Sequence, residues 1–186
     1  IDGLPAAKSA YDVSPVRLEI HQLPVQKRFD IQIKTELAPQ HNTELMGLYR
    51  TNGVYCTQCE PEGFRRITYF PDRPDILSVY SVRIEARRNE AQFLLSNGNP
   101  AASGNGWAEW YDPWPKPAYL FALVAGDLVA HSDHFTTASG KSVDLNIWVR
   151  KGDEDKCAYA MDALKRSMKW DEDVYGREYD LDVFNI

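Results

Sequence analysis

The chain has 186 residues, enough for one domain with a hydrophobic core, or for one domain and part of a second. Its 21 Lys and Arg against 27 Asp and Glu give a net charge of -6, and basic residues are everywhere interspersed with acids, which argues against nucleic acid as a partner. No apolar run approaches the roughly 20 residues of a membrane helix, and the N-terminus lacks the basic and apolar regions of a signal peptide, so we expect a cytoplasmic protein with no membrane partner.

Alternating apolar and polar residues predict half-buried antiparallel strands through the first two thirds of the chain. The predicted strands are Val16–Leu23, Arg28–Leu37, Arg66–Phe70, Tyr80–Arg87, Ala91–Asn97, Trp107–Asp112 and Tyr119–Gly126. Between them, Ser96–Gly106 has the composition of turns, and Asp112–Pro117 is too rich in proline for the interior of a sheet. This pattern predicts a mainly β fold, an antiparallel sandwich or saddle.

The last third of the chain changes its periodicity. A hairpin is predicted from His134–Ala138 and Ser142–Arg150, joined by a three-residue link that contains Gly140. Apolar residues then recur at three and four positions through Asp155–Tyr175, which predicts a helix that ends at Gly176, and a strand follows over 178–186. We therefore predict a β domain over residues 1–132 and the beginning of an α/β unit, made of a hairpin, a helix and a strand, over residues 133–186.

The two ends suggest a piece of a longer polypeptide. The chain begins without Met and stops in a strand-like alternation, so we expect the first strands of the β domain to be missing and the α/β unit to be truncated.

The residues usually involved in catalysis form no recognisable constellation. Cys56 and Cys59 have redox spacing, but they lie in a predicted loop rather than at the start of a helix, and no second Cys pair accompanies them. His131 and His134 are three apart without a predicted helix to bring them together. Three cysteines also fall short of a disulfide framework, which favours a reducing compartment.

The stretch "CTQCEPEGFRRITYFPDRPD" (56–75) holds the remaining candidates, Gln58 and Glu60. Glu60 lies in a loop crowded with arginines, so it either pairs with one of them at the surface or serves as a carboxylate that receives a cation.

Several long segments resemble, in order, the bacterial-type aminopeptidase N family of zinc-dependent exopeptidases. They are "GLYRTNGVYCTQCEPEGFRRITYFPDRPD", "LLSNGNP", "WYDPWPKPAYLFALVAGD", "FTTASGKSVDLNIWV" and "MDALKRSMKWDEDVYGREYDLDVFNI", which together span most of Leu45–Ile186. The resemblance implies an N-terminal β saddle domain, followed by the start of a thermolysin-like catalytic domain. The zinc motif His-Glu-x-x-His and the Gly-x-Met-x-Asn motif would follow Ile186, so the resemblance implies no catalytic or metal residue within this segment.

The resemblance also assigns a role to the loop. Glu60 matches one of the carboxylates that bind the substrate's α-ammonium group, and Gln58 lines the same subsite. The implied activity is peptide hydrolysis from a free N-terminus, with one zinc ion held by residues beyond Ile186 and with the rest of the catalytic domain as a partner. We further expect Arg65, Arg66 and Arg73 to brace the loop or the interdomain face rather than act on substrate, and Pro61 to allow a cis Glu60–Pro61 bond.

Two alternatives stay open at this point. A non-catalytic β-sandwich module would bind protein or carbohydrate through aromatic residues in the region of Trp107, Trp110, Tyr111 and Trp114. A pseudoenzyme of the same family would retain the saddle domain without zinc.

Overall fold

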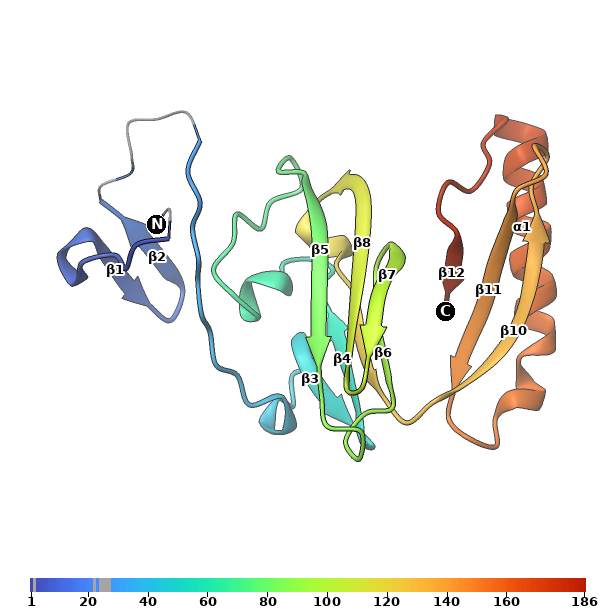
Figure 1. Cartoon of the computed structure of the whole chain (residues 1–186), viewed down its shortest axis with the longest axis horizontal. Helices are drawn as coiled ribbons and strands as arrows, with labels where there is room; N and C mark the ends of the chain where they lie inside the picture. Colours follow the sequence, from blue (N-terminus) through green and yellow to red (C-terminus); the bar gives the residue numbers. More distant parts are fainter. Residues whose placement is uncertain (2, 22, 24–27) are drawn as a thin grey trace.

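A computed structural model describes residues 1, 3–21, 23 and 28–186 (Figure 1). The strands of this described part are β1 (Tyr11–Ser14), β2 (Arg17–Ile20), β3 (Gly47–Thr51), β4 (Val54–Gln58), β5 (Ser78–Glu85), β6 (Phe93–Ser96), β7 (Asn99–Gly104), β8 (Trp107–Lys116), β9 (Leu123–Gly126), β10 (Val129–Thr136), β11 (Ser142–Val149) and β12 (Val183–Asn185). Helix α1 spans Ala158–Tyr175. The fold is mainly β with a hairpin, a helix and a strand at its C-terminal end, which confirms the predicted fold class.

Two antiparallel sheets pack face to face in the middle of the molecule. One has the strand order β3-β4-β9-β6 and the other has the order β5-β8-β7. Their shared core contains Ile84, Ala91, Leu94, Trp110 and Ala125. The indole Nε1 of Trp110 donates a hydrogen bond to the Leu94 carbonyl at 2.9 Å, so β8 and β6 are joined across the core by a polar contact as well as by apolar burial.

A third sheet and α1 form the C-terminal unit. Its strand order is β10-β11-β12, with β12 parallel to β11, and Figure 1 shows α1 lying along β10 and β11. Alternate residues of β11, Val143, Leu145 and Ile147, pack in one core cluster with Met161 and Met168 of the helix. Each fully buried aliphatic side chain contributes about 1.5–3 kcal/mol to the free energy of unfolding. The buried face of β11 therefore holds the helix on the sheet.

Helix α1 ends where the sequence predicts. Gly176 adopts a left-handed conformation with φ of 60°, and its N–H donates to the Glu172 carbonyl at 3.0 Å. The Arg177 N–H donates to the Asp171 carbonyl at 3.3 Å, so a left-handed glycine cap satisfies carbonyls of the last helical turn. Within the described residues, no helix is long and apolar enough to span a membrane.

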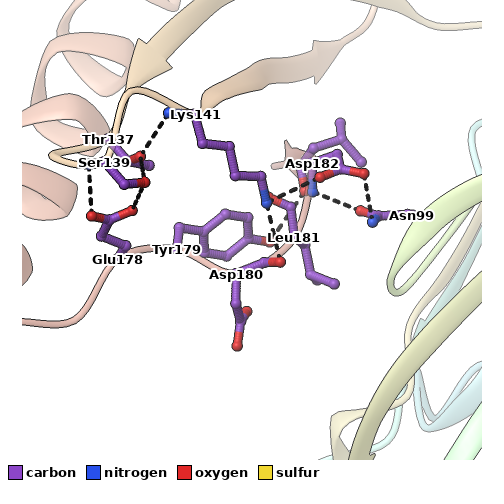
Figure 2. Close-up of polar contacts among 10 residues, drawn as sticks. Asn99, Thr137, Ser139, Lys141, Glu178, Tyr179, Asp180, Leu181 and Asp182 are labelled. Atoms are coloured by element: carbon purple, nitrogen blue, oxygen red, sulfur yellow. Dashed lines mark hydrogen bonds and ion pairs between the residues drawn. The ribbon is translucent and has the colours of Figure 1, made fainter.

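Polar contacts hold the segment between α1 and β12 against the β10–β11 turn (Figure 2). The Glu178 carboxylate accepts hydrogen bonds from the Ser139 N–H at 2.8 Å and from the Ser139 hydroxyl at 2.6 Å. Lys141 Nζ donates to the carbonyls of Asp180 at 3.1 Å and Leu181 at 2.9 Å. The chain after the helix therefore returns to β11 along a defined path, and β12 can pair there.

The N-terminal strands differ from the prediction. Within the predicted strand Val16–Leu23, β2 covers Arg17–Ile20 and pairs with β1, while residue 22 lies outside the described residues. The predicted strand Arg28–Leu37 is wrong, because the described residues of that segment form no ladder with another strand. Alternation predicts which residues suit a strand, but it does not supply the neighbouring strand that a ladder requires.

Two predictions in the middle of the chain are also wrong. Arg66–Phe70 is not a strand, because Phe64, Ile67 and Phe70 recur every three residues and pack into one cluster from a 3-10 turn and loop. The predicted turn region Ser96–Gly106 contains strand β7, an edge strand paired with β8, whose register shifts next to Pro100. Proline is tolerated there because an edge strand has one unpaired side.

Strand β8 runs through the proline-rich stretch that we expected to leave the sheet. Pro113 and Pro115 belong to β8, but its regular pairing with β5 ends at Tyr80 opposite Asp112, and only Ser78 opposite Lys116 pairs beyond it. The prolines therefore occupy the irregular part of the ladder, where missing N–H donors cost little.

The division into two domains at residues 132 and 133 stays a prediction. In the structure this boundary falls inside β10, which begins at Val129 and pairs along its whole length with β11. The change from the central sandwich to the third sheet thus occurs between β9 and β10.

Removing the hydroxyl of Tyr80 should not destabilise the protein. This hydroxyl is buried without a hydrogen-bond partner in the described structure, so Tyr80→Phe removes an unsatisfied polar group and should raise the free energy of unfolding by up to about 1 kcal/mol. Tyr179→Phe is the matched control, because the Tyr179 hydroxyl donates to the Val183 carbonyl at 3.1 Å and its loss should cost about 1 kcal/mol. Urea unfolding of both variants measures the difference, and a clear loss for Tyr80→Phe would contradict this account.

Candidate functional site

The candidate loop begins at the end of a tight hairpin. β3 and β4 pair in register from Gly47 opposite Gln58 to Thr51 opposite Val54. The two linking residues, Asn52 and Gly53, have φ angles of 47° and 86°, as a two-residue hairpin turn requires. The Asn-Gly pair is a strong sequence signal that our strand prediction missed, and it places Gln58 at the last position of β4.

The chain then turns sharply through residues 60–63. The Gly63 N–H donates to the Cys59 carbonyl at 2.8 Å, and Glu62 adopts a positive φ of 69°. A Cβ at Gly63 would lie 2.2 Å from the Gln58 carbonyl oxygen, so only glycine fits. The expected cis Glu60–Pro61 bond is wrong, because the described peptide bonds are all trans. The turn is instead closed by the conformations of Glu62 and Gly63.

Gln58 fixes the backbone of the turn. Its side-chain amide donates from Nε2 to the Glu60 carbonyl at 2.8 Å. Because the NH₂ group faces this carbonyl, the amide oxygen Oε1 is the part of the side chain left to accept a hydrogen bond. The structure thus brings the two predicted site residues together.

An ion pair between half-exposed Arg65 and the buried carboxylate of Asp72 braces the turn. The Asp72 side chain is 4% exposed, and its Oδ2 accepts hydrogen bonds from the Arg65 N–H at 3.0 Å and from Arg65 Nε at 3.2 Å. Arg65 Nη2 also donates to the Asp72 carbonyl at 2.7 Å. These bonds confirm that Arg65 braces the loop. Sequence reasoning missed Asp72, whose burial had no local signal.

A cluster of aromatic side chains packs next to the Arg65–Asp72 ion pair. The Phe64 ring makes edge contacts with Phe70 and Phe121, both at 5.1 Å between centroids, and with Tyr80 at 6.3 Å. Cys59 packs in the same cluster, so the turn is anchored on both sides of Glu60 by buried residues.

Glu60 differs from the other carboxylates of the loop. Glu62 pairs with Arg65, Glu44 with Arg66, and Asp75 with Arg73. The Glu60 side chain is exposed and forms no hydrogen bond or ion pair with the part of the chain that the structure describes. Each nearby arginine is already engaged by another carboxylate, which leaves the charge of Glu60 available for a cationic group from outside.

The candidate residues do not line the cavity next to the C-terminal strands. A cavity of about 530 Å³ separates the central sandwich from β11 and β12, and neither Gln58 nor Glu60 lines it. The Glu60 side chain is exposed, so its carboxylate lies at an open surface of the described structure.

The cysteines do not form a redox site of the thioredoxin type. Cys56 lies within β4, and Cys59 follows its last residue, so no helix begins at this motif. Burial raises the pKa of the Cys59 thiol to about 11, with the nearby Asp72 charge acting in the same direction. Among the described residues, no group of three His, Cys, Asp or Glu side chains is placed to hold a metal ion.

The aromatic residues of the alternative binding surface do not share one exposed face. Trp110 is buried in the sandwich core, and Arg83 covers the ring of Trp107 at 4.2 Å. Tyr111 and Trp114 are about half exposed. The structure thus divides the proposed aromatic surface between core and solvent.

Known proteins resemble this chain along most of its length. The Peptidase M1 N-terminal domain matches residues 6–120, more than half of the chain. Aminopeptidase N of Caulobacter vibrioides is 56% identical over 191 residues, which cover 100% of this chain and 22% of that protein. Aminopeptidase N of Escherichia coli is 51% identical over 174 residues, which cover 91% of this chain and 20% of that protein.

A solved structure agrees with the fold described above. The crystal structure of Legionella pneumophila aminopeptidase A in complex with aspartic acid superposes with a TM-score of 0.86 and 33% sequence identity, over 99% of this chain and 22% of that chain. The chain thus spans about a fifth of the length of these relatives.

The cysteine environments predict unequal reactivity. The thiolate is the reactive form, so the raised pKa and 3% exposure of Cys59 should slow its alkylation by iodoacetamide at pH 8 at least about tenfold relative to the more exposed Cys56. Buried Cys157 should react as slowly as Cys59. Peptide mapping by mass spectrometry over a time course measures the rates, and equal rates at Cys56 and Cys59 would contradict the structure.

Proposed function

This chain belongs to the peptidase M1 family, and from that premise we propose that it is part of a zinc-dependent aminopeptidase in which Glu60 and Gln58 bind the substrate's free α-ammonium group. One observation supports this proposal most directly: the Glu60 carboxylate has no partner in the described structure. The neighbouring carboxylates all form ion pairs with arginines. The substrates of the intact protein would be peptides with a free N-terminus.

The chemistry of the loop suits an ammonium ligand. An α-amino group has a reference pKa of about 7.7–8.0, so it is largely cationic near neutral pH. Glu60 supplies the counter-charge, and charge-assisted hydrogen bonds of this kind are short and strong. Gln58 Oε1 supplies a second, neutral acceptor while its NH₂ group keeps the turn in place. An ammonium has three N–H donors, so two acceptors from this loop leave at least one donor for another part of the protein.

A fixed ammonium subsite implies exopeptidase specificity. A substrate held by its first nitrogen presents its first peptide bond at a set distance from the subsite, and internal segments of a chain lack the charge that binds. An acetylated N-terminus has no ammonium, so it should bind poorly.

The zinc ion belongs to the proposal but not to the described residues. They contain no group of three potential ligands placed to hold a metal, so the proposal assigns zinc and its ligands to residues beyond Ile186 in a longer chain. The contribution of the present residues is to bind and orient the amino terminus.

Neutralising Glu60 tests the proposal. In the zinc-loaded full-length protein, Glu60→Gln should raise KM and lower kcat/KM for aminoacyl substrates about 100-fold, equivalent to about 2.7 kcal/mol, because the ammonium loses its counter-charge. Steady-state kinetics with aminoacyl p-nitroanilides measures the change, and zinc content should stay the same.

Glu62→Gln is the matched control for this experiment. Glu62 is an exposed carboxylate in the same turn that pairs with Arg65 at 3.5 Å, and exposed pairs contribute little. The kcat/KM of the Glu62→Gln variant should stay within about threefold of the wild-type value. Unaltered kinetics for Glu60→Gln would remove Glu60 from the site, and a zinc-free, inactive full-length protein would favour the pseudoenzyme alternative.

Gln58 should contribute less than Glu60. Gln58→Met keeps the length of the side chain but removes both the donor to the Glu60 carbonyl and the acceptor Oε1. Since one or two neutral hydrogen bonds are lost, kcat/KM should fall about tenfold. The same kinetic assay compares the two variants, and a larger loss for Gln58→Met than for Glu60→Gln would reverse the assigned roles.

A further inference from the structure

A reciprocal pair of hydrogen bonds joins the central sandwich to the C-terminal unit (Figure 2). Asn99, the first residue of β7, donates from Nδ2 to Asp182 Oδ2 at 2.9 Å. In return, the Asp182 backbone N–H donates to Asn99 Oδ1 at 2.7 Å. The two residues are 83 positions apart in the sequence, so the pair fixes one unit against the other at a single point.

Asp182 is also tied to its own unit through its remaining polar atoms. Its second carboxylate oxygen, Oδ1, pairs with Lys141 Nζ at 3.0 Å, and its carbonyl accepts the Asp144 N–H at 2.9 Å. Asp144 lies on β11, opposite Val183 of β12. Asp182 therefore connects Asn99 to the third sheet through bonds that leave it little freedom to move.

Apolar contact between the two units is incomplete. Val183 packs against the sandwich core, and the ring of Phe93 lies 4.8 Å from that of Trp148. Between these contacts lies the cavity of about 530 Å³, lined by residues of both units. Loosely packed apolar surfaces set no unique orientation, whereas a two-bond pair of fixed geometry does.

We propose that Asn99 and Asp182 are positioning residues that set the place of Glu60 relative to the C-terminal unit. This inference rests on the function proposed above, in which Glu60 holds the substrate's ammonium group while hydrolysis occurs in the domain that the C-terminal unit begins. Glu60 follows β4 and Asn99 begins β7, and the sandwich core joins their sheets. A change of orientation at the Asn99 pair therefore moves Glu60, and displacements of about 1 Å between a binding group and the reacting bond cost up to about 100-fold in rate.

Asn97 provides a matched control for Asn99. Its amide also makes two hydrogen bonds, from Nδ2 to the Leu120 carbonyl at 3.0 Å and from the Ala122 N–H to Oδ1 at 2.6 Å, but both stay within the sandwich. In the zinc-loaded full-length protein, Asn99→Ala should lower kcat/KM for aminoacyl substrates about tenfold. The kcat/KM of Asn97→Ala should stay within about twofold of the wild-type value.

Coupling to Glu60 separates positioning from simple stabilisation. In a Glu60→Gln background the location of this side chain matters little, so adding Asn99→Ala should lower kcat/KM by less than about twofold. A purely stabilising contact would produce the same fold loss in both backgrounds, and that result would overturn the inference.

Exchanging the two side chains should restore the pair. Asn99→Asp alone places two carboxylates against each other. When Asn99→Asp is combined with Asp182→Asn, the carboxylate at position 99 can accept both bonds, one from the amide NH₂ and one from the backbone N–H of position 182. The double variant should recover kcat/KM to within about threefold of wild type.

Hydrogen exchange provides a readout that does not depend on activity. The Asp182 N–H donates to Asn99, so its exchange should be slow in the wild type and in the double variant, and at least about tenfold faster in Asn99→Ala. Unchanged exchange in Asn99→Ala, or equal kcat/KM for Asn99→Ala and Asn97→Ala in an active enzyme, overturns this inference alone. A zinc-loaded wild type that hydrolyses no aminoacyl substrate overturns the proposed function together with it.

Discussion

The ion pair between Asp72 and Arg65 is the interaction on which the candidate site depends. A carboxylate as buried as that of Asp72 is costly unless its charge is compensated, and Arg65 compensates it with both its backbone N–H and its guanidinium group. The same contact joins the end of the 60–63 turn to a segment seven residues further along. With Gly63 packed against the Gln58 carbonyl, the turn has little room to adopt another shape.

This geometry also determines the charge that the loop presents. Arginines and acids are nearly balanced in the stretch 56–75, but the structure pairs them selectively, and Glu60 is left over. A carboxylate without a partner on a braced loop is suited to bind a cation from outside, since no existing ion pair must be broken first. Membership of the peptidase M1 family makes a peptide's ammonium group the cation that we propose.

The central sandwich connects this loop to the rest of the chain. β4 and β7 belong to different sheets, but the Trp110 indole and the shared apolar core join them, so the loop at one end and Asn99 at the other belong to the same packed body. The third sheet is held to that body by fewer contacts, and the pairing of Asn99 with Asp182 is the most directional of them. In the described residues, this pair thus adds a directional constraint to the apolar contacts that Val183 and the Phe93 and Trp148 rings make between the two parts.

The sequence by itself determined the elements whose pattern is local. Period-two alternation located β5 and β11, spacing at three and four located α1, and Gly176 located its end, because each pattern reflects the side of one element that faces the core. The predicted arm His134–Ala138 overlaps only the end of β10, which begins at Val129. Gln58 and Glu60 were identified by resemblance to a family, while composition alone left Glu60 open to an ordinary surface pairing. Only the tertiary structure decided that Arg28–Leu37 lacks a ladder, that Asp72 rather than Glu60 engages Arg65, and that Asn99 meets Asp182. The missing ladder and the Asn99–Asp182 pair depend on which distant segment lies alongside, and such contacts leave no periodicity in the chain. The Arg65–Asp72 pair spans seven residues, but it depends on how the irregular loop between them folds, which no periodic pattern encodes.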